Sequence, residues 1–189
     1  DSAAITPRTR FAVFSSSKPL TATALHLLAD VGEVTYLDPV VRFLPEFAHG
    51  GKEAVTLRHL LLHQAGIADP ADSLELASCS DFAEMVHRIC RLEPEHPPGE
   101  GTSYHPLTGM AVLAGGVQRV SGQEFRSFCH DALFTPLGMD FTTFGLPRGV
   151  EDVTDTIGLT ADRRAVADVW SSPATRAVLH PAIGGYSTA

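Results

Sequence analysis

The sequence lacks the features that mark several classes of protein. Its 189 residues carry a net charge of −8 and contain no run of basic residues, which argues against binding to nucleic acid or to an anionic membrane. No stretch approaches the roughly 18 to 20 apolar residues that span a bilayer. The first ten residues lack the basic start and apolar block of a signal peptide. We therefore expect a small-molecule partner, no nucleic acid and no membrane span, and we favour a cytoplasmic location unless an upstream signal directs export.

The cysteines, and the one histidine pair with zinc-like spacing, do not form the pattern of a disulfide framework or a metal centre. The three cysteines, Cys79, Cys90 and Cys129, have no close-pair spacing, and we expect each to be a small buried apolar residue. His59 and His63 have the i, i+4 spacing of a zinc pair, but "HLLLH" has no glutamate and no evident third ligand. Acidic residues are dispersed, without a glycosidase pair. We expect structural roles for both histidines, and no metal or cofactor.

The 44% hydrophobic content is sufficient for one sizeable core, and no linker or repeat divides the chain. Apolar periodicity predicts a mostly helical molecule. A short strand is predicted over 10–14, with helices over about 18–32, 38–47, 57–63, 81–91, 106–120, 121–137 and 171–180, and a loop over 149–170. The expected helix starts are Asp38 with Pro39, Thr56 and Ser80, and Gly66 is expected to end the third helix. The expected buried face of the first helix is Leu20, Ala24, Leu27, Leu28 and Val31.

A cluster of three serines and a lysine, Ser15, Ser16, Ser17 and Lys18, allows two interpretations. Serine is common at helix starts, so the cluster can be a simple cap. Alternatively, Ser15 and Lys18 lie three residues apart, on one face of a helix, where a partly desolvated lysine can take the proton of a serine nucleophile. The backbone N–H groups of the helix start can then stabilise an oxyanion. The chain has twelve arginines and only two lysines, Lys18 and Lys52, and arginine effectively cannot lose its proton.

Five phrases carry a resemblance to a known family: "RFAVFSSSKPLTATALHLLADVGEVTYLDPVVRFLPEF", "VTLRHLLLHQAGI", "PGEGTSYHPLTGMAVLAGGVQRVSGQEF", "LFTPLGMDFTTFGLP" and "PAIGGYSTA". In order and spacing they resemble the serine beta-lactamase-related family, which includes class C beta-lactamases, D-Ala-D-Ala carboxypeptidases and esterases. The resemblance implies an α/β (α+β) fold of the beta-lactamase/transpeptidase type. It further implies that residues 1–189 are a single partial domain, mostly the helical region, truncated at both ends. The terminal sheet strands would be largely missing, and a second chain is one way to supply them.

The resemblance also assigns roles to individual residues. Ser15 matches the acylated nucleophile, Lys18 the lysine of the S-x-x-K motif, and Tyr104 the tyrosine of the Y-x-N motif, which works with the lysine as general base and then as proton donor. Pro106 stands where that motif usually has asparagine, which puts amide and beta-lactam recognition in doubt. His105 can supply a substrate-binding polar group instead, or can be an exposed residue at a helix start. The family's K-T-G or H-x-G motif and one oxyanion donor would lie beyond residue 189.

The function expected from these residues is that of a serine hydrolase acting through an acyl-enzyme, most simply on small carboxylic esters. A beta-lactamase or a D-Ala-D-Ala carboxypeptidase is the alternative with the same chemistry. A non-catalytic binding module on the same fold is the alternative of another class. Gly184 and Gly185 in "PAIGGYSTA" lack a phosphate-binding pattern, so we expect a close backbone approach there and no nucleotide site.

Overall fold

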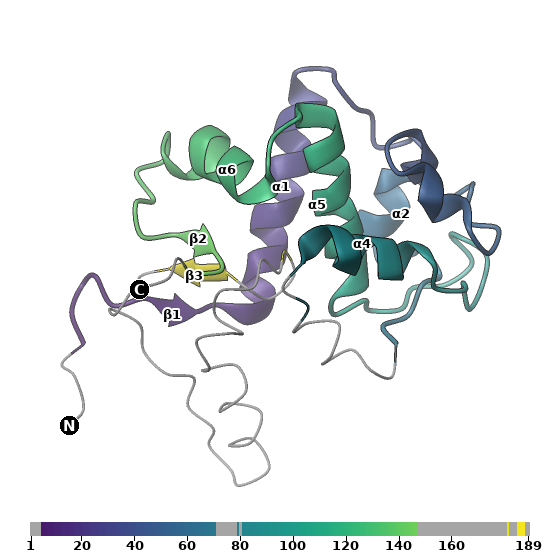
Figure 1. Ribbon diagram of the computed structural model, residues 1–189, viewed down its shortest axis with the longest axis horizontal. Helices are drawn as coiled ribbons and strands as arrows, with labels where there is room; N and C mark the ends of the chain where they lie inside the picture. The colour runs from purple at the N-terminus through teal and green to yellow at the C-terminus, as the bar shows by residue number, and fades with distance from the viewer. Residues whose placement is uncertain (1–4, 71–78, 80, 147–180, 182–184, 188–189) are drawn as a thin grey trace, which may run out of the picture.

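Helices make up most of the structure, a computed structural model that describes residues 5–70, 79, 81–146, 181 and 185–187. The helical elements are η1 (Phe14–Ser16), α1 (Ser17–Asp30), η2 (Val40–Arg42), η3 (Pro45–Ala48), α2 (Leu57–Leu61), α4 (Phe82–Cys90), α5 (Thr108–Ser121), α6 (Phe125–Cys129) and η4 (His130–Phe134). The strands are β1 (Phe11–Ala12), β2 (Thr143–Phe144) and β3 (Gly185–Ser187). Figure 1 shows α1 and α5 side by side, with α2 and α4 to one side and α6 and the strands to the other.

Helix α5 is the centre of the core and confirms the prediction of a buried helix at 106–120. Its residues from Thr108 to Val117 are all buried. Glycine and alanine in this stretch let neighbouring helices approach closely: a Cβ added at Gly115 would lie 3.2 Å from a methyl group of Val86 in α4. The helix ends at Gly122, whose φ of +69° is the left-handed C-cap conformation that glycine adopts without strain. None of the helices in the described ranges is long and apolar enough to cross a membrane.

The buried face of α1 differs from the predicted one. The residues of α1 that are buried are Ser17, Lys18, Thr21, Ala24, Leu25 and Leu28, whereas Val31 is 70% exposed. Ala24 and Leu28 are buried as predicted, and Leu20 and Leu27 pack partly buried against the core, so the prediction was wrong only for Val31. It missed the polar members of the face because it counted only apolar residues. Three polar side chains occupy the N-terminal half of the buried face, and two of them bond distant backbone: Thr21 Oγ1 donates to Pro181 O at 2.6 Å, and Ser17 Oγ accepts from Gly185 N at 2.8 Å.

Strand β3 joins two short strands that are far away in the sequence. The sheet order is β1-β3-β2, with both pairs antiparallel; Ala12 and Thr143 both pair with Tyr186. Gly185 approaches α1 so closely that an added Cβ would lie 2.6 Å from Ser17 Oγ, so only glycine fits. The expected close backbone approach is thus confirmed at Gly185, whereas Gly184 lies outside the described residues.

Several predicted boundaries require correction. The segment 38–47 forms no continuous helix but two 3₁₀ turns, η2 and η3, and Asp38 bonds the Thr35 backbone and Arg42 and caps neither turn. Helix α2 ends at Leu61, before Gly66. Asp81, not Ser80, is the N-cap of α4, where its carboxylate accepts from two backbone N–H groups. The predicted cap at Thr56 is confirmed.

The segment 121–137 is helical as predicted, through α6 and the π-helical η4. The predicted loop over 149–170 and the predicted helix over 171–180 lie outside the described residues.

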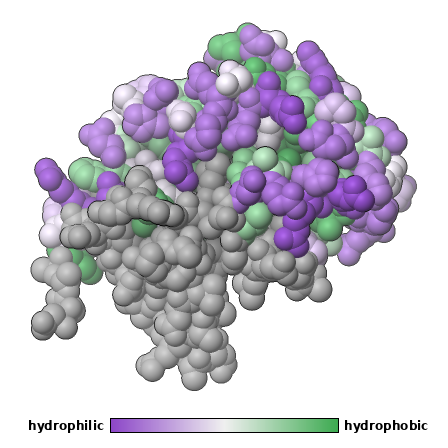
Figure 2. Space-filling model, viewed as in Figure 1, coloured by the Kyte–Doolittle hydropathy of each residue, from purple (hydrophilic) through white to green (hydrophobic). Residues whose placement is uncertain are grey.

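Cys90 and Cys129 are buried as expected, and burial raises the pKa of both thiols to about 12; Cys79 is half-buried. The face in Figure 2 is mainly hydrophilic where described residues form it, with scattered apolar side chains.

Candidate active site

A strained turn positions Ser15. Phe14 has a φ of +42°, which is uncommon for a bulky residue, and it opens the 3₁₀ turn η1 that leads directly into α1. Ser17 Oγ donates to Phe14 O at 2.5 Å, and Val13 N donates to Gly185 O at 2.9 Å, so the turn is bonded to α1 and to β3. Ser15 is therefore exposed on a tight turn that precedes the α-helix. The prediction from its spacing to Lys18 had placed it within the helix.

The Ser15 hydroxyl meets the other two predicted catalytic side chains. Lys18 Nζ donates to Ser15 Oγ at 3.0 Å, and the Tyr104 hydroxyl lies 3.1 Å from the same oxygen. Lys18 is 8% exposed and its ammonium lies 5.1 Å from the centre of the Tyr104 ring. Tyr104 comes from the loop before α5 and is 56% exposed. Two groups that can exchange protons thus lie within hydrogen-bonding distance of the Ser15 hydroxyl, on an exposed turn that a ligand can reach.

The environment of Tyr104 lowers the pKa of its phenol below the usual value of 10.0. Burial acts in the opposite direction, but it is outweighed by hydrogen bonds to Lys18 and Ser15 and by the positive charge of Lys18. A phenol with a lowered pKa gives up a proton more readily and is a better acid toward a leaving group.

Residues 1–189 match the Beta-lactamase family model over their whole length. The chain belongs to the Beta-lactamase family. It is 33% identical over 135 residues to the esterase/beta-lactamase LipL of Mycobacterium tuberculosis, covering 71% of this chain and 31% of LipL. It is 35% identical over 139 residues to penicillin-binding protein 4* of Bacillus subtilis, covering 70% of this chain and 30% of that protein. The chain thus spans about a third of the length of these curated relatives.

Solved structures of the family confirm the predicted fold. A penicillin-binding protein homologue from Caulobacter crescentus is 29% identical and superposes with a TM-score of 0.76, covering 97% of this chain and 53% of the other. A family VIII carboxylesterase is 25% identical with a TM-score of 0.83, covering 96% and 53%. This beta-lactamase family chain therefore has the beta-lactamase/transpeptidase-like α/β (α+β) fold. Its described part is mostly helical, with one small sheet.

His105 lies in the interior of this beta-lactamase family chain. It is 0% exposed, and neither ring nitrogen has a hydrogen-bond partner among the described residues. The prediction of an exposed helix-start residue is wrong, because the ring faces the core, where Gly109 of α5 approaches it. A ring with no exposed surface also offers a substrate no atom, so the structure speaks against the predicted substrate contact. Burial, together with the neighbouring His63, lowers the pKa of His105 to about 4.

The buried His105 ring is expected to make the folded chain less stable in acid. The unfolded chain protonates this ring below pH 6.5, whereas the folded chain resists protonation down to about pH 4, so folding stability falls as pH falls through that window. Between pH 7 and pH 4.5 the expected loss is about 2 kcal/mol, since one pKa unit is worth about 1.4 kcal/mol and the transition of the folded chain is not complete at pH 4.5. Urea unfolding at pH 7 and pH 4.5 measures it. In His105→Phe the difference should shrink by most of this amount, whereas a change at the exposed His87 (His87→Gln) should not alter it. An undiminished difference in His105→Phe would contradict the prediction.

The zinc-pair spacing of His59 and His63 has another explanation. His59 Nδ1 accepts from Thr56 N at 3.1 Å, and Thr56 Oγ1 accepts from His59 N at 3.3 Å, so His59 completes the capping box of α2. His63 lies beyond the end of that helix. Across the described ranges, no group of three His, Cys, Asp or Glu side chains is arranged to hold a metal ion.

Sequence reasoning missed Asp69, which holds the start of α5. Its Oδ1 accepts from Leu107 N at 3.2 Å and from Thr108 N at 3.0 Å. A cap that lies 38 and 39 residues away in the sequence leaves no local signal. Ser17 was likewise treated only as part of a cap, although its hydroxyl joins η1 to β3.

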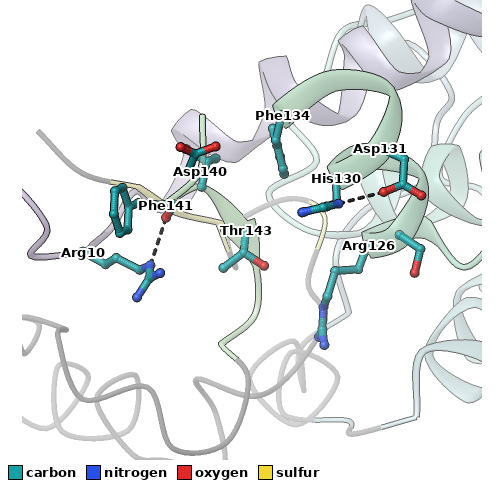
Figure 3. Close-up of a pocket in the computed structure, with 10 residues that line it drawn as sticks. Arg10, Arg126, His130, Asp131, Phe134, Asp140, Phe141 and Thr143 are labelled. Atoms are coloured by element: carbon teal, nitrogen blue, oxygen red, sulfur yellow. Dashed lines mark hydrogen bonds and ion pairs between the residues drawn. The ribbon is translucent and has the colours of Figure 1, made fainter. Parts of the chain in front are cut away.

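A separate cavity of about 360 Å³ lies beside β2, α6 and η4 (Figure 3). Arg10 borders it and donates to Phe141 O at 3.0 Å, and His130 bonds Asp131 at 2.7 Å. Its lining residues include none of the three predicted catalytic residues. This cavity therefore does not serve the candidate active site.

Proposed function

We propose that this chain carries the nucleophile and proton-transfer groups of a serine hydrolase that works through an acyl-enzyme, with a small carboxylic ester as substrate. The observation that supports this most directly is the convergence of Lys18 Nζ and the Tyr104 hydroxyl on Ser15 Oγ, at 3.0 and 3.1 Å. A serine hydroxyl becomes a useful nucleophile only when a neighbouring base takes its proton.

The proposed reaction has two halves. The reaction begins from the form in which Lys18 is a neutral amine. Ser15 Oγ bonds to the ester carbonyl carbon while its proton passes to Lys18 Nζ, and the carbonyl π electron pair moves onto oxygen. The tetrahedral intermediate then expels the alkoxide, which leaves as an alcohol with a proton from Tyr104, and Lys18 returns a proton to Tyr104. In the second half, water bonds to the acyl carbon while one of its protons passes to Lys18. The bond to Ser15 Oγ then breaks, Ser15 takes a proton from Tyr104, Lys18 returns its proton to Tyr104, and the carboxylic acid is released.

Esters are favoured over amides as substrates by the names of relatives and by Pro106. LipL is described as an esterase/beta-lactamase, and esterase EstB of Burkholderia gladioli is 30% identical over 149 residues. A beta-lactamase or D-Ala-D-Ala carboxypeptidase is the second candidate, since penicillin-binding protein 4* is also a relative.

Covalent trapping tests the proposal. We expect a fluorophosphonate to react with the full-length protein in a one-to-one ratio, with the adduct on Ser15 in peptide mass spectrometry. An adduct on another residue, or none, would overturn the proposal and favour the binding module. A penicillin probe at the same serine distinguishes the second candidate, because a stable penicilloyl adduct requires beta-lactam recognition.

Pro106→Asn is expected to narrow the preference for esters. An added side-chain amide can hold an amide carbonyl, and one hydrogen bond to a buried polar group is worth roughly ten- to a hundredfold in rate. The measurement is the ratio of kcat/KM for nitrophenyl butyrate to that for a chromogenic cephalosporin. Pro106→Ala is the control, because it removes the ring without adding an amide. A parent protein that hydrolyses both substrates equally well would refute the prediction.

We also retain the proposal that a second chain can contribute sheet strands beside the three-stranded sheet. Native mass spectrometry of the full-length protein tests it, because a strictly monomeric and active protein excludes such a contribution.

A further inference from the structure

We propose that His63 is a positioning residue that holds Tyr104 against Ser15 and Lys18. The proposal rests on the proposed function, because it explains how the proton donor of that reaction is kept in place. His63 is not itself a catalytic residue, since its hydrogen bonds and ring contacts are to Ser103, Tyr104 and His105. It acts through the loop that carries Tyr104.

His63 contacts three consecutive residues of that loop, Ser103 to His105. His63 O accepts from Ser103 N at 2.9 Å, and His63 Nδ1 accepts from His105 N at 3.1 Å. Between these two hydrogen bonds, the His63 ring packs against the Tyr104 ring with 4.9 Å between centres and a tilt of 57°. The backbone on both sides of Tyr104 and the face of its ring therefore share one support.

Tyr104 needs such a support because the core does not hold it. Its side chain is 56% exposed, so close packing does not fix its position. On the C-terminal side, Asp69 secures Leu107 and Thr108 at the start of α5, but Pro106 has no N–H to bond. Among the described contacts, the two hydrogen bonds that Ser103 N and His105 N donate to His63 are thus the backbone hydrogen bonds nearest to Tyr104.

His63 itself has the backbone and the charge state that the role requires. Its φ of +56° lies in the left-handed region, which turns the chain after α2 toward the loop. Nδ1 accepts a hydrogen bond only when it carries no proton. The ring faces Lys18 of α1, Asp69, Tyr104 and His105; burial and then the charge of Lys18 lower the pKa of His63, while Asp69 acts in the opposite direction. The ring is therefore neutral at pH 7.

Two substitutions separate the hydrogen bond from backbone strain. Asparagine and glycine both accept a φ of +56° readily, so neither variant is strained there. Asparagine places an acceptor oxygen near the position of Nδ1, whereas glycine removes both the acceptor and the ring. His63→Asn and His63→Gly in the full-length protein therefore differ in whether His105 N keeps a side-chain partner.

The decisive readout does not depend on turnover. The phenol of Tyr104 is titrated by ultraviolet absorbance as the difference between each protein and its Tyr104→Phe counterpart. In His63→Gly the pKa of Tyr104 should rise toward its usual value of 10.0, because the phenol moves away from Lys18 and Ser15. In His63→Asn it should stay close to that of the parent. His59→Phe is the control, because it breaks the capping box of α2 and should lower Tm without changing the Tyr104 titration.

Kinetics give the second readout. A misplacement of about 1 Å can cost roughly a hundredfold, so His63→Gly should lose ten- to a hundredfold in kcat with a smaller change in KM, and His63→Asn should recover most of it. An unchanged Tyr104 titration in His63→Gly would overturn the proposal, and so would a His63→Asn variant as impaired as His63→Gly. If the parent protein hydrolyses no ester, the proposed function fails, and the Tyr104 titration still decides whether His63 positions the phenol.

Discussion

Replacing Ser15 by alanine is expected to lower hydrolysis of a short-chain nitrophenyl ester by about a thousandfold or more. The acyl-enzyme cannot form without Oγ, and the remaining rate comes only from binding and from the surrounding dipoles. Because Ser15 is exposed, the substitution leaves no cavity, and circular dichroism and Tm should remain those of the parent.

Ser16→Ala is the matched control for that experiment. Ser16 is the exposed neighbour of Ser15, and its side chain makes no capping hydrogen bond to α1. We expect it to keep the parent's kcat/KM within about twofold, as for a surface substitution worth less than about 0.5 kcal/mol. Turnover retained by a well-folded Ser15→Ala protein would exclude Ser15 as the nucleophile, and equal losses in both variants would point to damage of the turn.

The fold could be predicted where one physical pattern dominates. Helix α5 was located correctly, because a long apolar and small-residue segment has few alternatives to burial. The buried face of α1 was predicted only in part. Ala24 and Leu28 are buried as expected, but Ser17 and Thr21 were missed, because they are buried with hydrogen bonds to residues more than 150 positions away. Apolar periodicity contains no information about such partners. The prediction of a helix over 38–47 was wrong for another reason, since Asp38 bonds the nearby Thr35 backbone and Arg42 instead of starting a helix.

The candidate site was predicted from two kinds of information. The spacing of Ser15 and Lys18 is local, and it led to the hypothesis of a nucleophile and its base. Tyr104 lies 89 residues from Ser15 and followed only from the family resemblance. His63 was assigned to the scaffold, because its contact with the Tyr104 loop spans about 40 residues and has no sequence signature.

The scarcity of lysine was a weaker clue than it seemed from the sequence. Lys52, the only other lysine in the sequence, is also nearly completely buried, at 1% exposure. Its ammonium donates to the carbonyl groups of His49 and Leu92 and lies over the Phe47 ring, so it joins two loops. Burial lowers the pKa of Lys52, and the nearby Glu93 acts in the opposite direction. A compact ammonium is therefore useful here for structure, and rarity alone does not identify a catalytic base.

Lys18→Arg is the experiment that separates these roles at the candidate site. Arginine keeps the positive charge beside Tyr104 but effectively never loses its proton, so it cannot accept the proton of Ser15. If Lys18 is the base, Lys18→Arg should be nearly as damaging to ester hydrolysis as Ser15→Ala, a loss of about a thousandfold. Fluorophosphonate labelling of Ser15 should slow in parallel, because that reaction also needs the serine proton removed.

Chemical rescue distinguishes lost proton transfer from poor packing of the larger guanidinium. Lys18→Ala leaves a space that a small primary amine can enter, so added ethylamine or propylamine should restore part of kcat. The recovery should rise with pH as the fraction of neutral amine rises, since only the neutral form accepts a proton. The same amines should not rescue Ser15→Ala, which has no nucleophile to activate. A Lys18→Arg protein that kept most of its rate would show that Lys18 acts through its charge, and would leave Tyr104 as the group that takes the serine proton.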